Sequence, residues 1–454
     1  TTHIKTFKNT GTIQSNNNKN SITVKAQNNQ TPILENFIND GTIKGKIGIE
    51  NHKNNNNGNL TITVKTFENK KTIDGHIYMG LWKGNGTISI ENFNNAGTIK
   101  SNNDDGGVYF EKGNIHIQTF KNTGTITGDN DGKNGWGVFF KDIRVVKTFE
   151  NTGFISGSGD NSQAGGLMTG GGVSMSGGTI ETFINKGTIQ STGTNHYPAG
   201  VKLNYATVKT FENTGLISGP NGFITIKGTI DNFINKGTIE SKGKGGRDAA
   251  IRIHTAELQF SSITNFTNEG TIKSASNGIL IESGNKIGTL TNQGTIESKL
   301  NGIDFIDDGG HSSPDKAELG KIILEEGSSI KAEKKGINID NQTSKNIRTA
   351  GIEVQKGASV SGDEAGIYLG KGKEITAPIT VSGTVSGGNA GIVNEGKMTK
   401  GITHNGEAEL VISNYGLVEE DDKGNTVANN GSGSVRIKEW VVTTNEETGK
   451  LRTV

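Results

Sequence analysis

Acidic side chains recur at one place in three neighbouring copies of a repeated motif. Asp104, Asp131 and Asp160 each lie five residues after an Ile of that motif. If successive copies stack, the carboxylates form a column, in which like charges about 5 Å apart repel unless a cation, a lysine or water separates them. Three interpretations follow: a solvated acidic edge, which the pattern favours, a weak calcium site, and carboxylates that cleave polysaccharide. No other cofactor is expected.

Other catalytic patterns are missing from the sequence. It has no Cys, no G-x-S-x-G motif and no H-E-x-x-H motif, which are signatures of common nucleophiles and zinc sites. The His residues stand singly in different parts of the repeat, and we expect them at the surface: His3, His52, His76, His116, His196, His254, His311 and His404. The sequence therefore predicts a protein that is not an enzyme, with a polysaccharide lyase or hydrolase as the alternative.

Aromatic residues in polar, Gly-rich stretches are the candidates for binding. Trp136 and Tyr197 stand in expected loops, and Trp82 ends the stretch Met-Gly-Leu-Trp. An exposed aromatic ring can stack on a sugar or anchor a protein partner. Local loop packing is the simpler explanation for each of them, and both interpretations stay open.

The elements that must position these residues come from a repeat of 22 to 34 residues. The pattern F-x-N-x-G-x-I is complete at nine starts, namely Phe7, Phe37, Phe93, Phe120, Phe149, Phe183, Phe211, Phe233 and Phe266. Imperfect copies begin at Phe67, Leu290 and Ile412. Periods of this length indicate one supersecondary unit per repeat.

Each period is expected to contain three short strands. One ends at the motif Phe and Asn, one follows the motif Gly, and one follows a second Gly, as in Gly107-Val108-Tyr109-Phe110. This pattern predicts an all-β fold, a right-handed parallel β-helix of about 15 coils stacked about 4.8 Å apart. We expect regular coils over residues 1–300 and a continuing β-helix with an altered coil pattern over residues 301–454.

The motif Asn is expected to be structural. Asn and Gly tolerate the left-handed backbone of tight corners, and an Asn repeated at one corner can bond to its equivalent in the next coil. The predicted ladder consists of Asn9, Asn39, Asn95, Asn122, Asn151, Asn185, Asn213, Asn235 and Asn268.

The composition excludes several classes. A formal net charge of +1 lacks the excess of Lys and Arg that nucleic-acid binding requires, and Gly 68 with Pro 5 does not fit collagen. No run of 18 apolar residues occurs, and the first residues do not read as a signal peptide, so we expect that any targeting segment has been removed.

A cysteine-free, Gly- and Asn-rich β-helix with N-x-G-T-I corners resembles the passenger of a Gram-negative type V autotransporter, the group that includes pertactin and the self-associating adhesins. The resemblance implies secretion across the outer membrane and display at the bacterial cell surface, tethered through a C-terminal barrel. No barrel pattern precedes Val454 and both ends look cut from a longer array, so we expect a passenger fragment.

The expected function is adhesion. Most insertions fall between the second and third strands of a period, so their loops share one edge, where binding residues usually gather. The partner is expected to be a host-cell surface protein or glycan, or the same protein on a neighbouring bacterium. An inert stalk that spaces a missing domain is a further alternative.

Overall fold

The computed structural model forms two compact units, Thr1–Ile230 and Asp231–Val454. It describes residues 2–15, 20–26, 31–51, 60–81, 86–101, 106–129, 135–159, 170–255, 259–306, 318–340, 348–444 and 451–452. Over these residues the chain is all-β, without a helix, and it winds as a parallel β-helix. The predicted fold class is confirmed, and the numbers of coils and strands differ slightly from those expected.

The first face of the first unit carries the motif Phe and Asn. Alternating residues of each strand point inward, as in β13, where Ile115, Ile117 and Phe120 are buried. Its strands are β1 (His3–Asn9), β4 (Ile33–Asn39), β7 (Leu60–Asn69), β10 (Gly86–Asn95), β13 (Asn114–Asn122), β16 (Val145–Asn151), β18 (Gly171–Asn185) and β20 (Ala199–Asn213).

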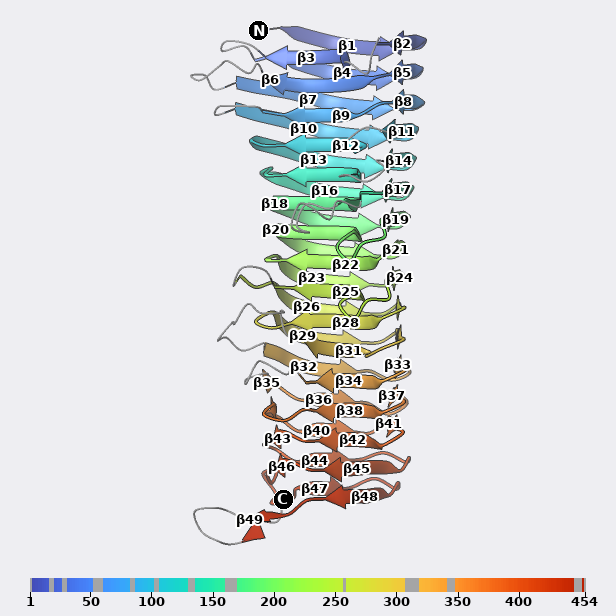
Figure 1. The fold of residues 1–454 in the computed structure, drawn as a ribbon. Coiled ribbons are helices and arrows are strands. Elements are labelled where there is room, and N and C mark those ends of the chain that lie inside the picture. Colours follow the sequence, from blue (N-terminus) through green and yellow to red (C-terminus); the bar gives the residue numbers. More distant parts are fainter. Residues whose placement is uncertain are drawn as a thin grey trace. The chain divides into compact units, whose positions relative to one another are not determined.

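The second face of the first unit follows the motif Gly and is a row of short parallel strands (Figure 1). In the first unit these are β2 (Thr12–Gln14), β5 (Thr42–Lys44), β8 (Thr72–Asp74), β11 (Thr98–Ser101), β14 (Thr125–Gly128), β17 (Phe154–Gly157), β19 (Thr188–Ser191) and β21 (Leu216–Gly219). The third face consists of β3 (Asn20–Ala26), β6 (Lys46–Asn51), β9 (Ile77–Gly80), β12 (Val108–Glu111), β15 (Trp136–Lys141) and β22 (Asn221–Ile226). Two coils have fewer separate strands than the expected three, because β18 and β20 each run from the third face into the first.

The second unit has the same three faces. Its first face is β23 (Thr229–Asn235), β26 (Ser262–Asn268), β29 (Lys286–Asn292) and β32 (Glu318–Leu324), followed by pairs of shorter strands, β35 (Arg348–Thr349) with β36 (Ile352–Val354), β39 (Glu374–Ile375) with β40 (Ile379–Val381), β43 (Lys397–Met398) with β44 (Ile402–His404), and β46 (Leu417–Val418) with β47 (Val427–Asn429). The second face is β24 (Thr238–Ser241), β27 (Thr271–Ser274), β30 (Thr295–Ser298), β33 (Ser329–Ala332), β37 (Ser359–Gly362) and β41 (Thr384–Gly387). The third is β25 (Ala249–His254), β28 (Asn277–Glu282), β31 (Ile303–Ile306), β34 (Lys335–Ile339), β38 (Ala365–Leu369), β42 (Ala390–Asn394), β45 (Leu410–Asn414) and β48 (Val435–Trp440). A short antiparallel pair, β49 (Thr443–Thr444) and β50 (Leu451–Arg452), follows.

Like residues stack on like residues in the core of the first unit. Phe149 lies over Phe120 with ring centroids 5.0 Å apart and under Phe183 at 4.5 Å, and the same stacking joins Phe7, Phe37, Phe67, Phe93, Phe120, Phe149, Phe183 and Phe211. Offset stacks of this kind add to the stabilisation from burial of the rings.

The motif Asn residues form hydrogen-bonded ladders. Asn122 Nδ2 donates to Asn151 Oδ1 at 2.8 Å and also to the carbonyl oxygen of Gly124 at 3.1 Å, which closes its own corner. In the first unit the ladder runs through Asn9, Asn39, Asn69, Asn95, Asn122, Asn151, Asn185 and Asn213, and in the second through Asn235, Asn268 and Asn292. Asn69 and Asn292 come from the imperfect motif copies. These amides are buried, and their bonds satisfy polar groups that would otherwise be costly inside the coil.

The motif Gly lies at a close approach of backbones at most corners, although Lys71 takes this position in the imperfect copy that begins at Phe67. A Cβ atom on Gly124 would lie 2.0 Å from the carbonyl oxygen of Gly97, and one on Gly187 would lie 2.1 Å from that of Gly153. At Gly124 and Gly187 a larger side chain would therefore force the backbones of neighbouring coils to shift.

The predicted change of coil pattern after residue 300 stays a prediction. Along the first face of the second unit, Asn292 is paired in register with Leu324, and the corner position continues as Val354, Val381 and His404. None of the described segments forms an apolar helix of membrane-spanning length.

Candidate functional site

The predicted binding aromatics have different surroundings. Trp136 does not lie in a loop: it begins β15 and is 5% exposed, because its ring packs on Phe139 at a centroid distance of 4.2 Å and near Tyr109 at 6.0 Å. Tyr197 is half-buried, and Lys202 Nζ lies 5.9 Å from the centre of its ring. Trp82 lies outside the described residues. A binding role for these three residues stays a prediction.

The proposed calcium site also lies outside the described residues, since Asp104, Asp131 and Asp160 all fall in undescribed segments, as do most of the insertions expected on the shared edge. Within the described segments, no group of three or more His, Asp or Glu side chains is arranged to hold a metal ion. The calcium hypothesis therefore stays a prediction.

Three His residues are buried, which contradicts the expectation that the His residues lie at the surface. His76 is 2% exposed and its Nδ1 lies 2.9 Å from the carbonyl oxygen of Gly106. His404 is 1% exposed and stands in the corner column between Val381 and Asn429, where neither ring nitrogen has a hydrogen-bond partner among the described residues. The third, His254, belongs to a polar network.

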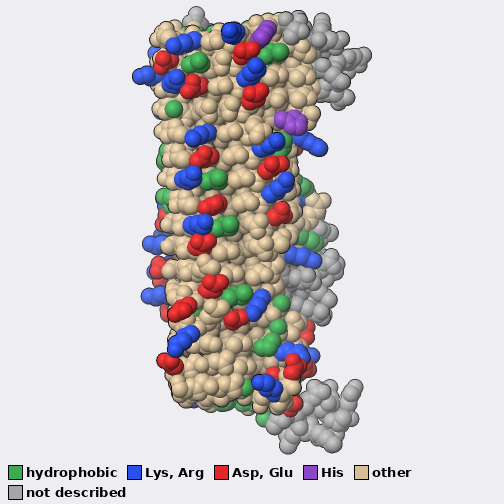
Figure 2. All heavy atoms as spheres, turned by 180° about the vertical axis from the view of Figure 1, so that it is seen from behind, with side chains coloured by type: hydrophobic (Ala, Val, Ile, Leu, Met, Phe, Trp, Pro, Cys, Tyr) green, Lys and Arg blue, Asp and Glu red, His purple; other side chains and the backbone are tan. Residues whose placement is uncertain are grey.

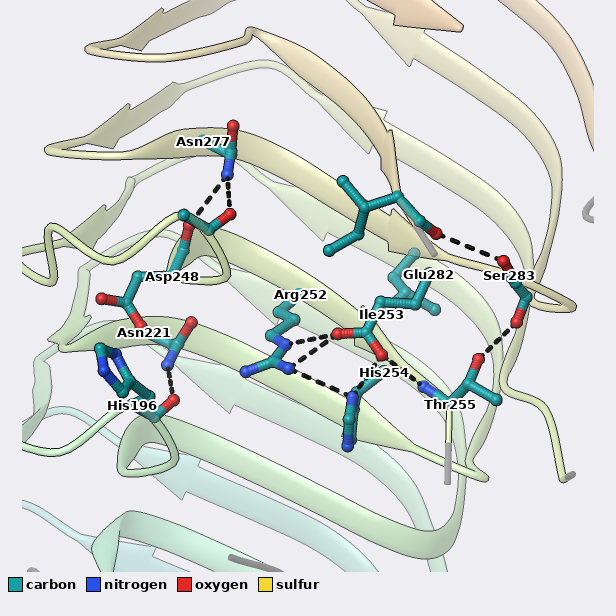
Figure 3. A network of polar contacts seen from close by, with 12 residues as sticks. His196, Asn221, Asp248, Arg252, Ile253, His254, Thr255, Asn277, Glu282 and Ser283 are labelled. Atoms are coloured by element: carbon teal, nitrogen blue, oxygen red, sulfur yellow. Dashed lines mark hydrogen bonds and ion pairs between the residues drawn. The ribbon is translucent and has the colours of Figure 1, made fainter. Parts of the chain in front are cut away.

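This network joins the outer sides of β25 and β28 in the second unit (Figure 3). Arg252 Nε and Nη2 donate to Glu282 Oε1 at 2.9 and 2.7 Å, and His254 Nδ1 donates to Glu282 Oε2 at 2.5 Å. Arg252 is 1% exposed and Glu282 is 0% exposed, so this is a buried ion pair. Burial alone would raise the pKa of Glu282, but the charge of Arg252 and the bond from His254 outweigh it and lower the pKa to about 2.

Backbone groups and amides complete the network. The amide N of Thr255 donates to Glu282 Oε2 at 3.1 Å, and Asn285 Nδ2 donates to Thr255 Oγ1 at 2.8 Å and to the carbonyl oxygen of Glu282 at 2.8 Å. A carboxylate with this many donors stays ionised at neutral pH, so it is not suited to act as a general acid. The arrangement fits a structural link between neighbouring coils.

A second buried acid lies one coil further on. Asp304 is 4% exposed and its Oδ1 accepts a hydrogen bond from Asn338 Nδ2 at 2.7 Å. Burial raises the pKa of Asp304 to about 6, because the bonds that favour the charged form do not compensate for the lost hydration.

An open groove of about 740 Å³ lies on the outer side of the third face of the second unit. It combines two Tyr, three Lys and three Glu side chains with small residues, and its lining is Lys335, Glu364, Ala365, Tyr368, Lys371, Asn389, Val393, Glu395, Ser413, Tyr415, Lys438 and Glu439. None of these residues was predicted from the sequence to belong to a site. The only signal was the alternation in β38, where Tyr368 stands between the inward residues Ile367 and Leu369.

No protein-family model matches the chain, and neither does any curated protein or any solved structure. The fold defines the chain as a parallel β-solenoid protein, consistent with a pertactin-like passenger.

Proposed function

We propose that this chain is part of an autotransporter passenger displayed at the bacterial cell surface, where it acts as an adhesin. Its partners are a host-cell surface protein or glycan, or the same protein on a neighbouring bacterium. The parallel β-helix fold is compatible with this proposal, and one surface of the first unit carries it.

This surface consists of two columns of polar side chains on the outer side of the first face. One column is uncharged and partly exposed: Thr66, Asn92, Thr119, Thr148, Thr182 and Thr210 stand in register on successive coils. The residue before each of these forms a mostly charged column: Lys65, Glu91, Gln118, Lys147, Glu181 and Lys209. Within this column, Lys209 Nζ lies 3.3 Å from Glu181 Oε1.

Such a surface favours adhesion because it offers the same weak contact many times. Each polar contact at an exposed site is worth little, but contacts repeated at the coil spacing add up when two arrays lie side by side. In Figure 2, basic and acidic side chains are interspersed over the visible face, so two copies can meet without strong repulsion.

The test is to display this segment on a non-adherent bacterium and to score both aggregation and attachment to host cells. We expect one or both with the intact segment. Reversing two charges of the column, Lys147→Glu with Lys209→Glu, should reduce aggregation. The matched control is Lys44→Glu with Lys100→Glu, which makes the same charge change at exposed positions of the second face. If the intact segment gives neither aggregation nor attachment, the adhesin proposal fails and an inert stalk is favoured.

A polysaccharide-acting enzyme is the second candidate. The observation that favours it is the groove of the second unit, where three carboxylates, Glu364, Glu395 and Glu439, line a hollow together with tyrosines. Incubation with polysaccharides would test it, since release of new reducing ends or unsaturated sugars would support cleavage and intact chains would contradict it.

A further inference from the structure

The groove on the second unit exists because small residues stand between large ones in a column of outward positions. Tyr368, Val393, Ser413 and Glu439 are paired in register on four successive coils. Beside them, Ala365 and Ala390 are paired in the same way and are buried. The floor is therefore made of short side chains, and longer ones rise around it.

Two tyrosines stand at different positions along the groove. Tyr368 and Tyr415 lie two coils apart, which is about 10 Å at the usual strand spacing. Tyr368 is half-buried and Tyr415 is 45% exposed, so part of each side chain is open to solvent. A short oligosaccharide can span this distance.

Both rings are held in place before any ligand arrives. Lys335 Nζ lies 3.7 Å from the centre of the Tyr368 ring, and Tyr415 Oη donates to Glu439 Oε2. Burial and the nearby charge of Glu395 raise the pKa of Tyr368, and the hydrogen bond to Glu439 raises that of Tyr415, so both hydroxyls stay protonated donors at neutral pH. Side chains that are already ordered lose little entropy on binding.

The charges that line the groove balance. It has three Lys (Lys335, Lys371, Lys438) and three Glu (Glu364, Glu395, Glu439). Lys438 Nζ also donates to the carbonyl oxygen of Asn389 at 2.9 Å. A polyanion would meet the three carboxylates as well as the lysines, whereas a ligand with many hydroxyl groups and no charge can use donors and acceptors of both kinds.

We propose that this groove binds a short uncharged oligosaccharide, with sugar rings against Tyr368 and Tyr415 and sugar hydroxyls bonded to the surrounding Lys, Glu and Asn side chains. The proposal names a ligand class for the adhesin and rests on that proposed function for its biological setting. The binding itself is measured on the purified chain and does not depend on it.

The experiment is a binding assay of the full chain against immobilised uncharged oligosaccharides, with heparin as the polyanionic comparison. We expect binding to uncharged glycans that persists at high salt. Tyr368→Ala and Tyr415→Ala should each weaken it at least about tenfold, as loss of an aromatic anchor usually does. Tyr415→Phe keeps the ring and should retain most of the affinity, which separates stacking from hydrogen bonding.

Tyr205→Ala is the matched control. Tyr205 is also 45% exposed and also has a lysine against its ring, with Lys227 Nζ 4.4 Å from the ring centre, but it belongs to the first unit and is not one of the groove residues. The Tyr205→Ala substitution should leave glycan binding unchanged. Melting curves for all variants exclude loss of folding as the cause.

Three results would overturn the proposal: no binding to any uncharged glycan, binding to heparin alone, or equal binding by the Tyr368→Ala and Tyr415→Ala variants. The adhesin function is tested separately from glycan binding. If bacteria that display the Tyr368→Ala and Tyr415→Ala variants still attach, the groove is not the adhesive site, but the adhesin function stands. If the chain binds glycan and gives neither attachment nor aggregation, the adhesin function is contradicted, but the glycan site stands.

Discussion

The two units build the same coil from different core residues. In the first unit the core position is Phe in eight consecutive coils, and the corner position is Asn in the same eight. In the second unit the core column passes from Phe266 to Leu290 and Ile322, and the corner column passes from Asn292 to Leu324. The winding continues through these changes. The difference shows that strand register and alternation specify the coil. Its interior can be filled in two ways, by stacked Phe with Asn ladders or by aliphatic side chains such as Leu and Ile.

The largest expected effect tests the core position. Phe149→Ala should lower the free energy of unfolding by about 3 to 5 kcal/mol, because it leaves a cavity between two stacked rings. Phe149→Leu should cost only about 1 to 2 kcal/mol, since it keeps most of the volume and imitates Leu290 of the second unit. Urea denaturation measures both. Equal costs for Leu and Ala would mean that the two ways of filling the core are not interchangeable.

A buried charge pair distinguishes the second unit. Glu282→Gln should destabilise it by about 3 to 5 kcal/mol at pH 7, because the buried Arg252 loses the carboxylate with which it forms an ion pair. The pKa of Glu282 is about 2 in the folded state against 4.5 without perturbation. The carboxylate therefore contributes stability above pH 4.5 that is lost as the pH falls toward 2, and the cost of the substitution should shrink over that window. A cost that is the same at pH 7 and pH 2 would contradict this assignment.

The corner ladder gives a smaller effect. Asn122→Ala should cost about 1 to 3 kcal/mol, because Asn151 Oδ1 loses its donor and stays buried. Val354→Asn is the reciprocal change in the second unit, where Leu324 and Val381 flank the position and offer no amide partner. We expect it to destabilise by a similar amount, as measured by urea denaturation. A stabilising Val354→Asn would show that an Asn corner needs no neighbouring Asn.

Asp304 should respond to pH with the opposite sign to Glu282. Its pKa is raised from 3.8 to about 6 in the folded state, so the folded chain binds the proton more tightly and loses stability as the pH rises through that window. Asp304→Asn keeps an acceptor for Asn338 and removes the buried charge. It should stabilise the second unit by on the order of 1 to 3 kcal/mol at pH 7 and have no effect at pH 3, as thermal melting at the two values will show. If Asp304→Asn destabilised the unit at pH 7, this account of the buried carboxylate would be contradicted.

The smallest expected effect is on the charged column of the first unit. Lys209→Ala removes the contact between Lys209 and Glu181. The two side chains are 57% and 39% exposed, respectively. Because solvent screens such pairs, the free energy of unfolding should change by less than about 1 kcal/mol. Any aggregation defect of a column variant then reflects the surface and not the fold. A larger loss of stability would mean that the column supports the coil itself.

The fold was predictable because the motif repeats what packing requires. Phe149, Asn151 and Gly153 each lie between two residues of the same type, one on the coil before and one on the coil after. A single motif therefore predicts the core residue, the corner residue and the site of close backbone approach. After residue 300 the motif degenerates, yet Leu324, Val354 and Val381 still stand on successive coils. In that region Ile and Val replace the motif residues, and spacing alone identifies a coil boundary poorly.

The candidate site was not predictable to the same extent. In Ala-Ile-Arg-Ile-His, residues 250–254, Ile251 and Ile253 point inside and Arg252 and His254 outside, as alternation requires, but His254 had been expected at the surface. Both outward side chains are buried, which a period of two cannot encode. Trp136 was misplaced for a related reason, because the glycines on either side of it hid the start of a strand.

The corner glycines have a genetic consequence. Since the coils that begin at Phe93, Phe120, Phe149 and Phe183 meet through Phe over Phe, Asn over Asn and Gly over Gly, the upper surface of one of them matches the lower surface of another. Unequal recombination between equivalent codons, such as a loss of residues 120–148, rejoins surfaces of the same design. We expect the shortened chain to stay folded with one coil fewer, and aggregation of that deletion would argue against it. Repeats of this kind let a lineage alter the reach of the molecule in whole coils without evolving a new contact.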